Sequence, residues 1–229
     1  MIMASTLFTD WGGRRWELRS ERVLVDHDAR TVVAADLHLG KSDHFRAAGV
    51  PVPEQTNADT LDRLATVCEA TAAESLIVLG DFFHSRDGVT PGLIEKLQAW
   101  RERTAWLDVF NVRGNHDRRA GDPPKSLDIE VWDKPVRDGD LVYAHEPEER
   151  EDAFVLCGHL HPAVKLSNGQ SRRGDRMRLP CFVLGERCAV LPAFGAFTGA
   201  KCVSPKKGQR IYVVGPGRVA DVSKAVVPA

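Results

Sequence analysis

Short apolar runs alternate with segments of helical spacing along the first half of the chain. The runs predict strands bounded by turn residues, and they are residues 22–25, 31–35, 76–79 and 106–112. Residues 54–72 repeat apolar side chains at helical intervals, and residues 91–106 predict a second helix with proline at its start. Alternating strands and helices favour a sheet with helices packed on it.

The second half changes to short β-like runs separated by turns, with no strong helix signal between them. These runs are residues 141–144, 154–156, 163–166, 178–184, 187–191 and 209–214. We therefore predict an α/β fold in which a two-layered β-sandwich core is flanked by helices, an α/β/β/α arrangement. Residues 1–229 are expected to form a single domain, since mixed α/β domains often reach about 250 residues.

The composition is that of a folded protein with little net charge. Hydrophobic residues make up 43% of the chain and charged residues 28%, and the net charge is −1. These proportions argue against global disorder. Proteins that coat nucleic acid are usually basic, so any contact with DNA must use a local basic patch.

The cysteine pattern and the hydropathy indicate where the protein works. Its five cysteines are odd in number and form no Cys-x-x-Cys pair. We expect small buried thiols in a reducing compartment rather than disulfides or a structural zinc site. The sequence contains neither a secretory signal nor an apolar run of about 18 residues. We therefore expect a cytoplasmic protein that does not associate with membranes.

Polar residues that can bind metal ions directly follow five of the predicted strands. They are Asp36, His38, Asp81, Asn115, His145, His159 and His161. Ligands collect at the carboxyl ends of strands in sheets of this kind, so we expect all seven at one rim. Carboxylate, amide oxygen and imidazole suit divalent metals. Seven ligands exceed the need of one ion, and they predict two ions roughly 3.5–4 Å apart that share a carboxylate.

The local spacing suggests how these side chains are aimed. Asp36 and His38 are two residues apart, so on an extended strand end they point the same way, and the same holds for His159 and His161. Glycine precedes three of the motifs, at positions 80, 114 and 158. We expect unusual backbone angles at these glycines.

In order, the motifs Asp-x-His, Gly-Asp, Gly-Asn-His-Asp, His and Gly-His-x-His resemble those of the calcineurin-type metallophosphoesterase superfamily. Residues 36–41, 80–85, 144–147, 158–162 and 191–195 together are similar to the DNA ligase-associated metallophosphoesterases. This second resemblance covers about residues 20–215. It implies a bacterial DNA-damage-response endonuclease or phosphodiesterase, with an ATP-dependent DNA ligase, an exonuclease and a helicase as functional partners.

The resemblance also implies a role for each motif residue. Asp36, His38 and His161 would hold one metal, and Asn115, His145 and His159 the other, with Asp81 bridging them. The nucleophile would be a hydroxide on the metals, which are expected to be two Mn²⁺, with zinc or iron as alternatives. His116 would stabilise the phosphate or protonate the leaving oxygen. Asp117 would orient His116.

Basic side chains that flank the metal loops, and a separate basic cluster in the second half of the chain, are candidates for substrate binding. These candidates are Lys41, Arg46, His84, Arg113, Arg172 and Arg173, and Arg176, Arg178, Lys206 and Lys207 extend the last cluster. Arginine and lysine both recognise phosphate, but charges at loop edges are also commonly only solvated. His84 equally suits a supporting role beside the metal ligands. Phe194 and Phe197 are expected to pack beneath the site rather than to stack on bases.

Three functions remain open from the sequence. The first is a two-metal phosphodiesterase or nuclease that cleaves DNA in a ligase-associated repair pathway. The second is a hydrolase of small phosphodiesters, nucleotides or phosphomonoesters. The third is a partner-binding subunit of a ligase or helicase complex. The sequence does not determine the oligomeric state.

Overall fold

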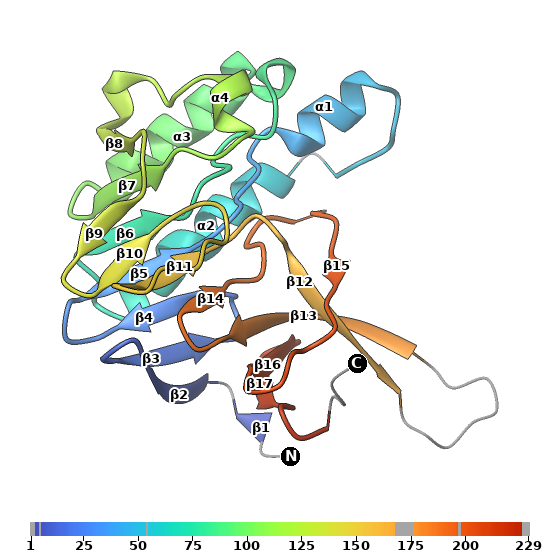
Figure 1. Ribbon diagram of the computed structural model, residues 1–229. Coiled ribbons are helices and arrows are strands. Elements are labelled where there is room, and N and C mark those ends of the chain that lie inside the picture. The colour runs from blue at the N-terminus through green and yellow to red at the C-terminus, as the bar shows by residue number, and fades with distance from the viewer. Residues whose placement is uncertain (1–2, 5, 54, 168–175, 197, 226–229) are drawn as a thin grey trace.

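Two β-sheets form the centre of the protein in the computed structural model, which describes residues 3–4, 6–53, 55–167, 176–196 and 198–225 (Figure 1). The first sheet has the spatial order β2 (Thr6–Trp11), β3 (Arg14–Arg19), β4 (Leu24–Asp26), β5 (Thr31–Ala34), β6 (Ser75–Val78), β7 (Asp108–Val112) and β8 (Ile129–Trp132). Strands β2 to β5 are antiparallel, whereas β5 to β8 are parallel. The carboxyl ends of β5, β6 and β7 therefore lie at the same edge.

The second sheet faces the first and is mostly antiparallel. Its order is β1 (Met3–Ala4), β17 (Arg218–Asp221), β16 (Arg210–Gly215), β13 (Arg176–Leu184), β14 (Cys188–Val190), β11 (Phe154–Cys157), β10 (Leu141–Tyr143) and β9 (Val136–Asp138). Strands β12 (Pro162–Ser167) and β15 (Lys201–Cys202) extend from β13. Because β10 and β11 are parallel neighbours, they too end at one edge.

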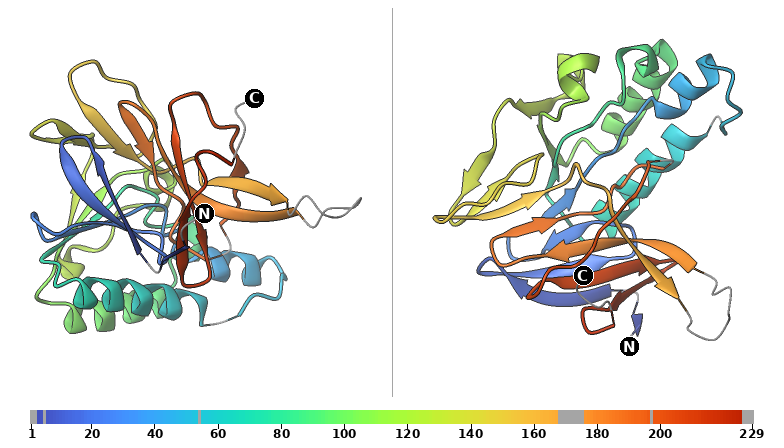
Figure 2. Two further views of the ribbon diagram at one scale, coloured as in Figure 1. Left: turned by 90° about the horizontal axis from the view of Figure 1, so that it is seen from below. Right: turned by 45° about the vertical axis from the view of Figure 1, so that its right-hand side comes forward.

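Helices α2 (Thr56–Ala70) and α3 (Pro91–Arg103) cover the outer face of the first sheet. The shorter helices are α1 (Lys41–Ala47), α4 (Asp117–Ala120) and the 3₁₀ helices η1 (Arg86–Gly88) and η2 (Lys125–Leu127). Helices α2 and α3 run side by side along one face of the molecule (Figure 2). Proline begins α3, and the Thr90 side chain accepts a hydrogen bond from the Leu93 N–H, 3.2 Å away, which caps the first turn.

The three apolar residues that end strand β5, Val32, Val33 and Ala34, are explained by burial on both faces. Successive side chains of a strand point to opposite faces. Val32 and Ala34 belong to the hydrophobic core under α2 and α3, whereas Val33 contributes to the core between the two sheets. A third core, which includes Val155 and Ile211, lies on the other face of the second sheet. A strand buried on both faces needs a continuous apolar run.

The α/β class with a two-layered β core is confirmed, and so are the two predicted helices, observed as α2 and α3. Residues 118–137, for which the sequence pattern predicted no element, contain most of α4, all of η2 and β8, and the start of β9. Of the cysteines, Cys68, Cys157 and Cys181 are buried as expected, but Cys202 is exposed. None of the helices in the described part of the chain is both long and apolar enough to span a bilayer. The assignment of a single domain stays a prediction.

Candidate metal centre

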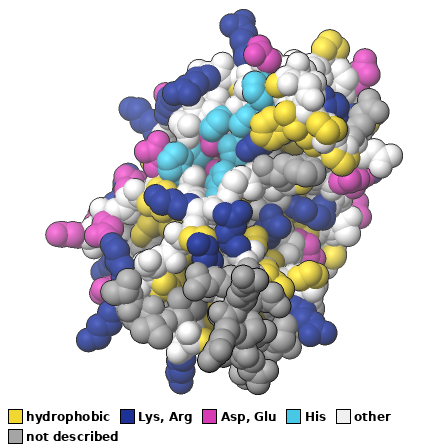
Figure 3. Space-filling view, turned by 90° about the vertical axis from the view of Figure 1, so that its right-hand side faces the viewer, with side chains coloured by type: hydrophobic (Ala, Val, Ile, Leu, Met, Phe, Trp, Pro, Cys, Tyr) yellow, Lys and Arg dark blue, Asp and Glu magenta, His cyan; other side chains and the backbone are white. Residues whose placement is uncertain are grey.

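The loops that follow β5, β6, β7, β10 and β11 meet where the edges of the two sheets converge. They bring together the seven residues that were predicted from separate motifs. On the surface, histidine side chains gather with carboxylates between them on one face of the molecule (Figure 3). The strand ends therefore place the polar residues as predicted.

One cluster consists of Asp36, His38 and His161, with a ligand atom from each lying within 4.8 Å of the other two. The His38 Nε2 and His161 Nε2 atoms are 3.1 Å apart. The His161 Nε2 atom is also 3.5 Å from the Asp36 Oδ1 atom. Two imidazole nitrogens and a carboxylate oxygen thus point at one small volume.

A second cluster is formed by Asp81, His145 and His159, again within 4.8 Å. The His145 Nε2 atom lies 3.4 Å from Asp81 Oδ1, 3.1 Å from His159 Nδ1 and 3.0 Å from Asn115 Oδ1. The amide oxygen of Asn115 therefore faces the same volume.

Asp81 lies between the two clusters. Its Oδ1 atom approaches His145, while its Oδ2 atom is 3.7 Å from the Nε2 atom of His38 in the first cluster. The Oδ1 atom also accepts a hydrogen bond from the backbone N–H of His116, 2.9 Å away. One carboxylate thus reaches both groups of ligands.

The carboxylates of Asp36 and Asp81 are buried without enough neighbouring positive charge to balance them. Asp36 is 0% exposed and Asp81 is 2% exposed, and in the described residues their ion-pair partners are histidines only. A buried charge is costly unless it is paired. Burial accordingly raises the pKa of Asp81, although His145 acts in the opposite direction. Divalent ions would supply the missing positive charge, and the oxygen and imidazole donors suit them.

The pKa values of the two histidines in the first cluster are shifted in opposite directions. Burial lowers the pKa of His38 to about 2, and the neighbouring His161 and His116 act in the same direction. His38 is therefore a neutral imidazole, the form that binds metals. Burial also acts to lower the pKa of His161, but contacts with Asp36 outweigh it and raise the pKa.

The backbone turns the ligands inward in a way that the spacing did not predict. Five of the seven have left-handed φ angles: Asp36 (55°), His38 (47°), Asp81 (51°), His159 (66°) and His161 (47°). Strand β5 ends at Ala34, so the expected extended conformation at residues 36–38 is wrong. Non-glycine residues rarely adopt these angles, and strain of this kind concentrates at functional sites.

The glycines before the motifs serve two purposes. Gly80 has the expected left-handed angle, with φ of 79°. Gly114 and Gly158 do not, so that expectation is wrong for them. A Cβ atom on Gly158 would lie only 2.5 Å from Asp36 Oδ2, and one on Gly114 would clash with the Asp81 carboxylate. These two glycines leave space for a ligand from another motif.

His116 reaches the centre beside His38, with 4.9 Å between the ring centroids. Its Nδ1 atom is 2.5 Å from the backbone oxygen of His84. The buried carboxylate of Asp117 instead accepts hydrogen bonds from the Phe83 and Gly114 N–H groups, each at 3.0 Å. The His84 carbonyl, rather than Asp117, therefore orients the His116 ring.

A family model for calcineurin-like phosphoesterases matches residues 29–171. The chain belongs to this family. The match covers every motif that supplies the two clusters, and together they identify the protein as a metal-dependent phosphoesterase.

A solved structure agrees with this assignment. The structure of Pseudomonas putida nuclease MPE is 37% identical, with a TM-score of 0.81, and the alignment covers 92% of this chain and 97% of that one. Yfce, a phosphoesterase from E. coli, is 15% identical, with a TM-score of 0.38 over 86% of this chain and 92% of that one. A search of the curated proteins gives no match.

The predicted substrate-binding residues of this phosphoesterase fall into two groups. Lys41, at the start of α1, is close enough to the centre for the Asp81 charge to oppose the lowering of its pKa by burial. His84 stacks on His116, which fits the supporting role. Arg46 instead pairs with Asp43, and Arg113 pairs with Asp122 and Asp133, so their charges are already balanced.

The structure describes only some of the predicted site residues in the C-terminal half of the chain. Arg172, Arg173 and Phe197 lie outside the described residues, and so does the side chain of Arg176. Arg178 is exposed and contacts the backbone oxygen of Ala200 at 3.3 Å. Lys206 and Lys207 are exposed. Phe194 is fully buried beneath the centre, as predicted.

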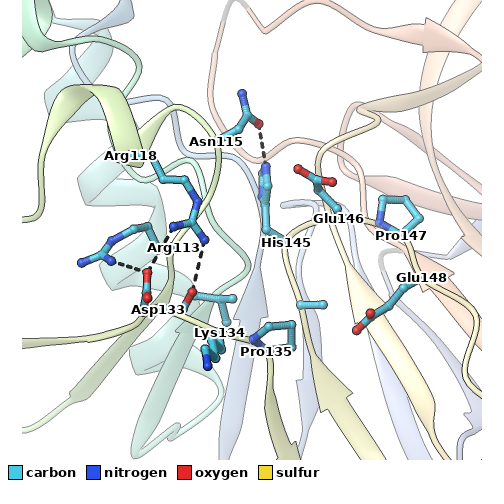
Figure 4. A pocket seen from close by; sticks show the side chains of 12 residues that line it. Arg113, Asn115, Arg118, Asp133, Lys134, Pro135, His145, Glu146, Pro147 and Glu148 are labelled. Carbon is cyan, nitrogen blue, oxygen red and sulfur yellow. Dashed lines mark hydrogen bonds and ion pairs between the residues drawn. The ribbon is translucent and has the colours of Figure 1, made fainter.

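A pocket of about 340 Å³ adjoins the second cluster of the phosphoesterase (Figure 4). Asn115 and His145 form part of its wall, together with Arg118, Lys134 and Glu146, none of which was a candidate from the sequence. Glu146 and Arg118 are each within three residues of a motif residue, a signal that could have found them. Lys134 has no such signal, because β8 and its loop bring it there.

Proposed function

We propose that this phosphoesterase is a two-metal phosphodiesterase that cleaves DNA strands and uses Mn²⁺. The observation that carries this proposal is the position of Asp81 between two clusters of metal-binding side chains. A DNA substrate is supported by the similarity, over 92% of the chain, to a protein described as a nuclease. The mixed carboxylate, amide and imidazole donors suit manganese.

In this proposal the seven ligands divide as the clusters do. Asp36, His38 and His161 would hold one ion, and Asn115, His145 and His159 would hold the other, with Asp81 shared between them. Bound ions of this kind polarise the phosphoryl oxygens and lower the pKa of coordinated water toward neutrality.

His116 is the proposed proton donor or phosphate ligand. A carbonyl oxygen only accepts hydrogen bonds, so the Nδ1 atom that faces the His84 oxygen must carry the proton. The Nε2 atom is left for the substrate. In the protonated ring this atom can donate to a phosphoryl oxygen or to the leaving oxygen. His84 and Lys41 are proposed as supporting and substrate-binding residues, respectively.

We also propose that the enzyme acts in DNA repair beside an ATP-dependent DNA ligase, an exonuclease and a helicase. This step rests on the motif similarity to ligase-associated phosphoesterases. Co-purification of the full chain with these enzymes, compared with Asp81→Asn, would test it. A complex that forms equally well with the inactive variant would favour the alternative role as a partner-binding subunit.

The decisive experiment is an activity screen with manganese, zinc, iron and magnesium. The substrates are bis-p-nitrophenyl phosphate, p-nitrophenyl phosphate and single- and double-stranded DNA. We expect diesterase activity and DNA cleavage with manganese, both abolished in Asp81→Asn and retained in the exposed control Asp62→Asn. Hydrolysis of the small esters without DNA cleavage would instead indicate a small-substrate hydrolase.

A further inference from the structure

A pocket of about 290 Å³ adjoins the first cluster of the metal centre, and His161 forms part of its wall. Arg22 and Arg63 line it together with small residues at positions 193, 195, 196 and 198–200. The Nδ1 atom of His161 is 2.9 Å from the backbone oxygen of Gly199, which ties this wall to the metal centre. Lysine and arginine side chains gather below the histidines on this face (Figure 3).

Both arginines are partly buried and use backbone carbonyls as partners. The Arg22 Nη1 atom donates to the Ala193 oxygen at 3.1 Å, and the Arg63 Nη2 atom donates to the Phe194 oxygen at 2.5 Å. The Arg63 guanidinium also lies over the Phe194 ring, 4.2 Å from its centroid. These contacts fix the two side chains but leave their charges unbalanced.

In the described residues neither arginine forms an ion pair with a carboxylate, and the buried Nε atom of Arg63 has no hydrogen-bond partner. Burial lowers the pKa of Arg63 to about 10, and the charge of Arg22 acts in the same direction. Glu21 and Asp59 partly offset this effect, but Glu21 is itself paired with Arg19. Binding of an anion would therefore relieve the repulsion between the two neighbouring guanidinium groups.

The chain accepts backbone strain at this pocket. Arg22 lies in the turn between β3 and β4 with φ of 71°, a left-handed angle that glycine or asparagine adopts more easily. Arg63, on α2, is 41 residues further along the chain, so only the tertiary fold brings its side chain near that of Arg22. Backbone strain of this kind concentrates at functional sites, which suggests that the Arg22 side chain has a binding role.

We propose that Arg22 and Arg63 form a second phosphate-binding site, which holds the phosphate group next to the one being cleaved. Guanidinium groups bind phosphate oxygens through paired, charge-assisted hydrogen bonds. The shared wall at His161 places this site beside the metal centre. The inference rests on the proposed phosphodiesterase function and explains how a DNA strand, rather than a single ester, is selected.

The first test compares thymidine dinucleotides that carry no terminal phosphate, a 5′-phosphate or a 3′-phosphate. The wild-type enzyme with manganese should prefer one phosphorylated form by about tenfold in kcat/KM. Arg22→Gln and Arg63→Gln should each reduce this preference, and the double variant should abolish it. Arg103→Gln, which removes an exposed charge nearby in the fold, should keep it. A preference that persists in the double variant overturns the proposal.

The second test does not depend on catalysis. Inorganic phosphate is titrated by calorimetry into the manganese-loaded full chain. The wild-type and Arg103→Gln proteins should bind one more phosphate per chain than the Arg22→Gln/Arg63→Gln double variant. Arg63→Lys, which keeps the positive charge, should bind phosphate more tightly than Arg63→Gln. Equal stoichiometry in all of them overturns the second site even if the diesterase activity stands. The expected difference without diesterase activity would keep the site and reject the proposed function.

Discussion

His84 and His116 stack with their ring centroids 4.9 Å apart and their planes inclined by 22°. The backbone oxygen of His84 simultaneously holds the Nδ1 atom of His116. One residue thus supports the neighbouring imidazole through both its side chain and its backbone. Burial lowers the pKa of His84 to about 4, with Lys41 acting in the same direction, so the supporting ring is neutral.

This relationship predicts different results for the two histidines. His116→Ala should lower kcat by about a hundredfold, because it removes the proposed proton donor. His84→Ala should lower kcat by about tenfold, because the backbone contact remains while the stacking is lost. His84→Phe, which keeps a stacked ring, should recover most of the activity. Steady-state kinetics and metal analysis of each variant test this.

Metal content provides the control for these variants. Both alanine variants should retain two ions per chain, as measured by mass spectrometry of the purified protein. Loss of metal from His116→Ala would make that residue a ligand. Loss of metal from His84→Ala would point to the group of His38, His84 and His116, whose nitrogen atoms also lie within 4.8 Å of one another.

Gly158 and Gly92 form a matched pair for testing space at the centre. A Cβ atom on Gly158 would lie 2.5 Å from Asp36 Oδ2 and 2.7 Å from the Ala35 Cβ atom, whereas one on Gly92 meets nothing within 4 Å. Gly158→Ala should destabilise the protein by about 1–3 kcal/mol and reduce metal content. Gly92→Ala, on α3, should leave both unchanged or raise stability slightly. Thermal unfolding and metal analysis would compare them, and equal behaviour would contradict the close contact.

Much of the fold was predictable because β5, β6 and β7 are buried on both faces and therefore read as apolar runs. The hairpin of β2 and β3 was missed, although Gly12 and Gly13 form the kind of turn that marks one. Helix α1 was missed for a different reason. Its seven residues bury only Ser42, so no apolar periodicity announces it.

The site was predictable to the extent that strand ends determine it. The seven ligands converge because neighbouring parallel strands end at the same edge. Each motif directly follows an apolar run, so the sequence shows which strands end there. The left-handed backbone at His38 and His161 could not be predicted, since residue spacing does not specify φ. Arg22 and Arg63 belong to no motif, and they share a pocket because the fold brings both to the backbone of residues 193–194.

Asp117 is predicted to stabilise the fold of the Gly-Asn-His-Asp loop. Its carboxylate accepts hydrogen bonds from two backbone N–H groups and from the Asn111 Nδ2 atom at 3.2 Å. Asp117→Asn replaces one accepting oxygen with a donor, which should cost about 1–3 kcal/mol. The unfolding temperature should therefore fall by several degrees. An unchanged temperature together with lost activity would instead support the predicted role of Asp117 in orienting His116.

Lys41 and Arg113 should differ in their effect on substrate binding. Lys41 has no ion pair in the described residues and senses the charge of Asp81, whereas Arg113 pairs with Asp122 and Asp133. Lys41→Gln should raise the KM for DNA by about tenfold, and Arg113→Gln should change it by less than about twofold. Steady-state kinetics of both variants on the same single-stranded DNA test this. A larger rise in KM for Arg113→Gln than for Lys41→Gln would refute the assignment of Lys41 to substrate binding.

Manganese should stabilise the protein through Asp36 and Asp81, because these buried carboxylates lack a lysine or arginine partner in the described residues. A hundredfold excess of metal over its Kd contributes about 2.7 kcal/mol, which corresponds to a rise of about 5–10 °C in Tm. Asp81→Asn should lose this rise, and the exposed control Asp62→Asn should keep it. Asp36 and Asp81 also repel each other, so without metal Asp81→Asn should be at least as stable as the wild type. If calorimetry with chelator showed this variant to be less stable, Asp81 would have a structural role of its own, independent of the cations.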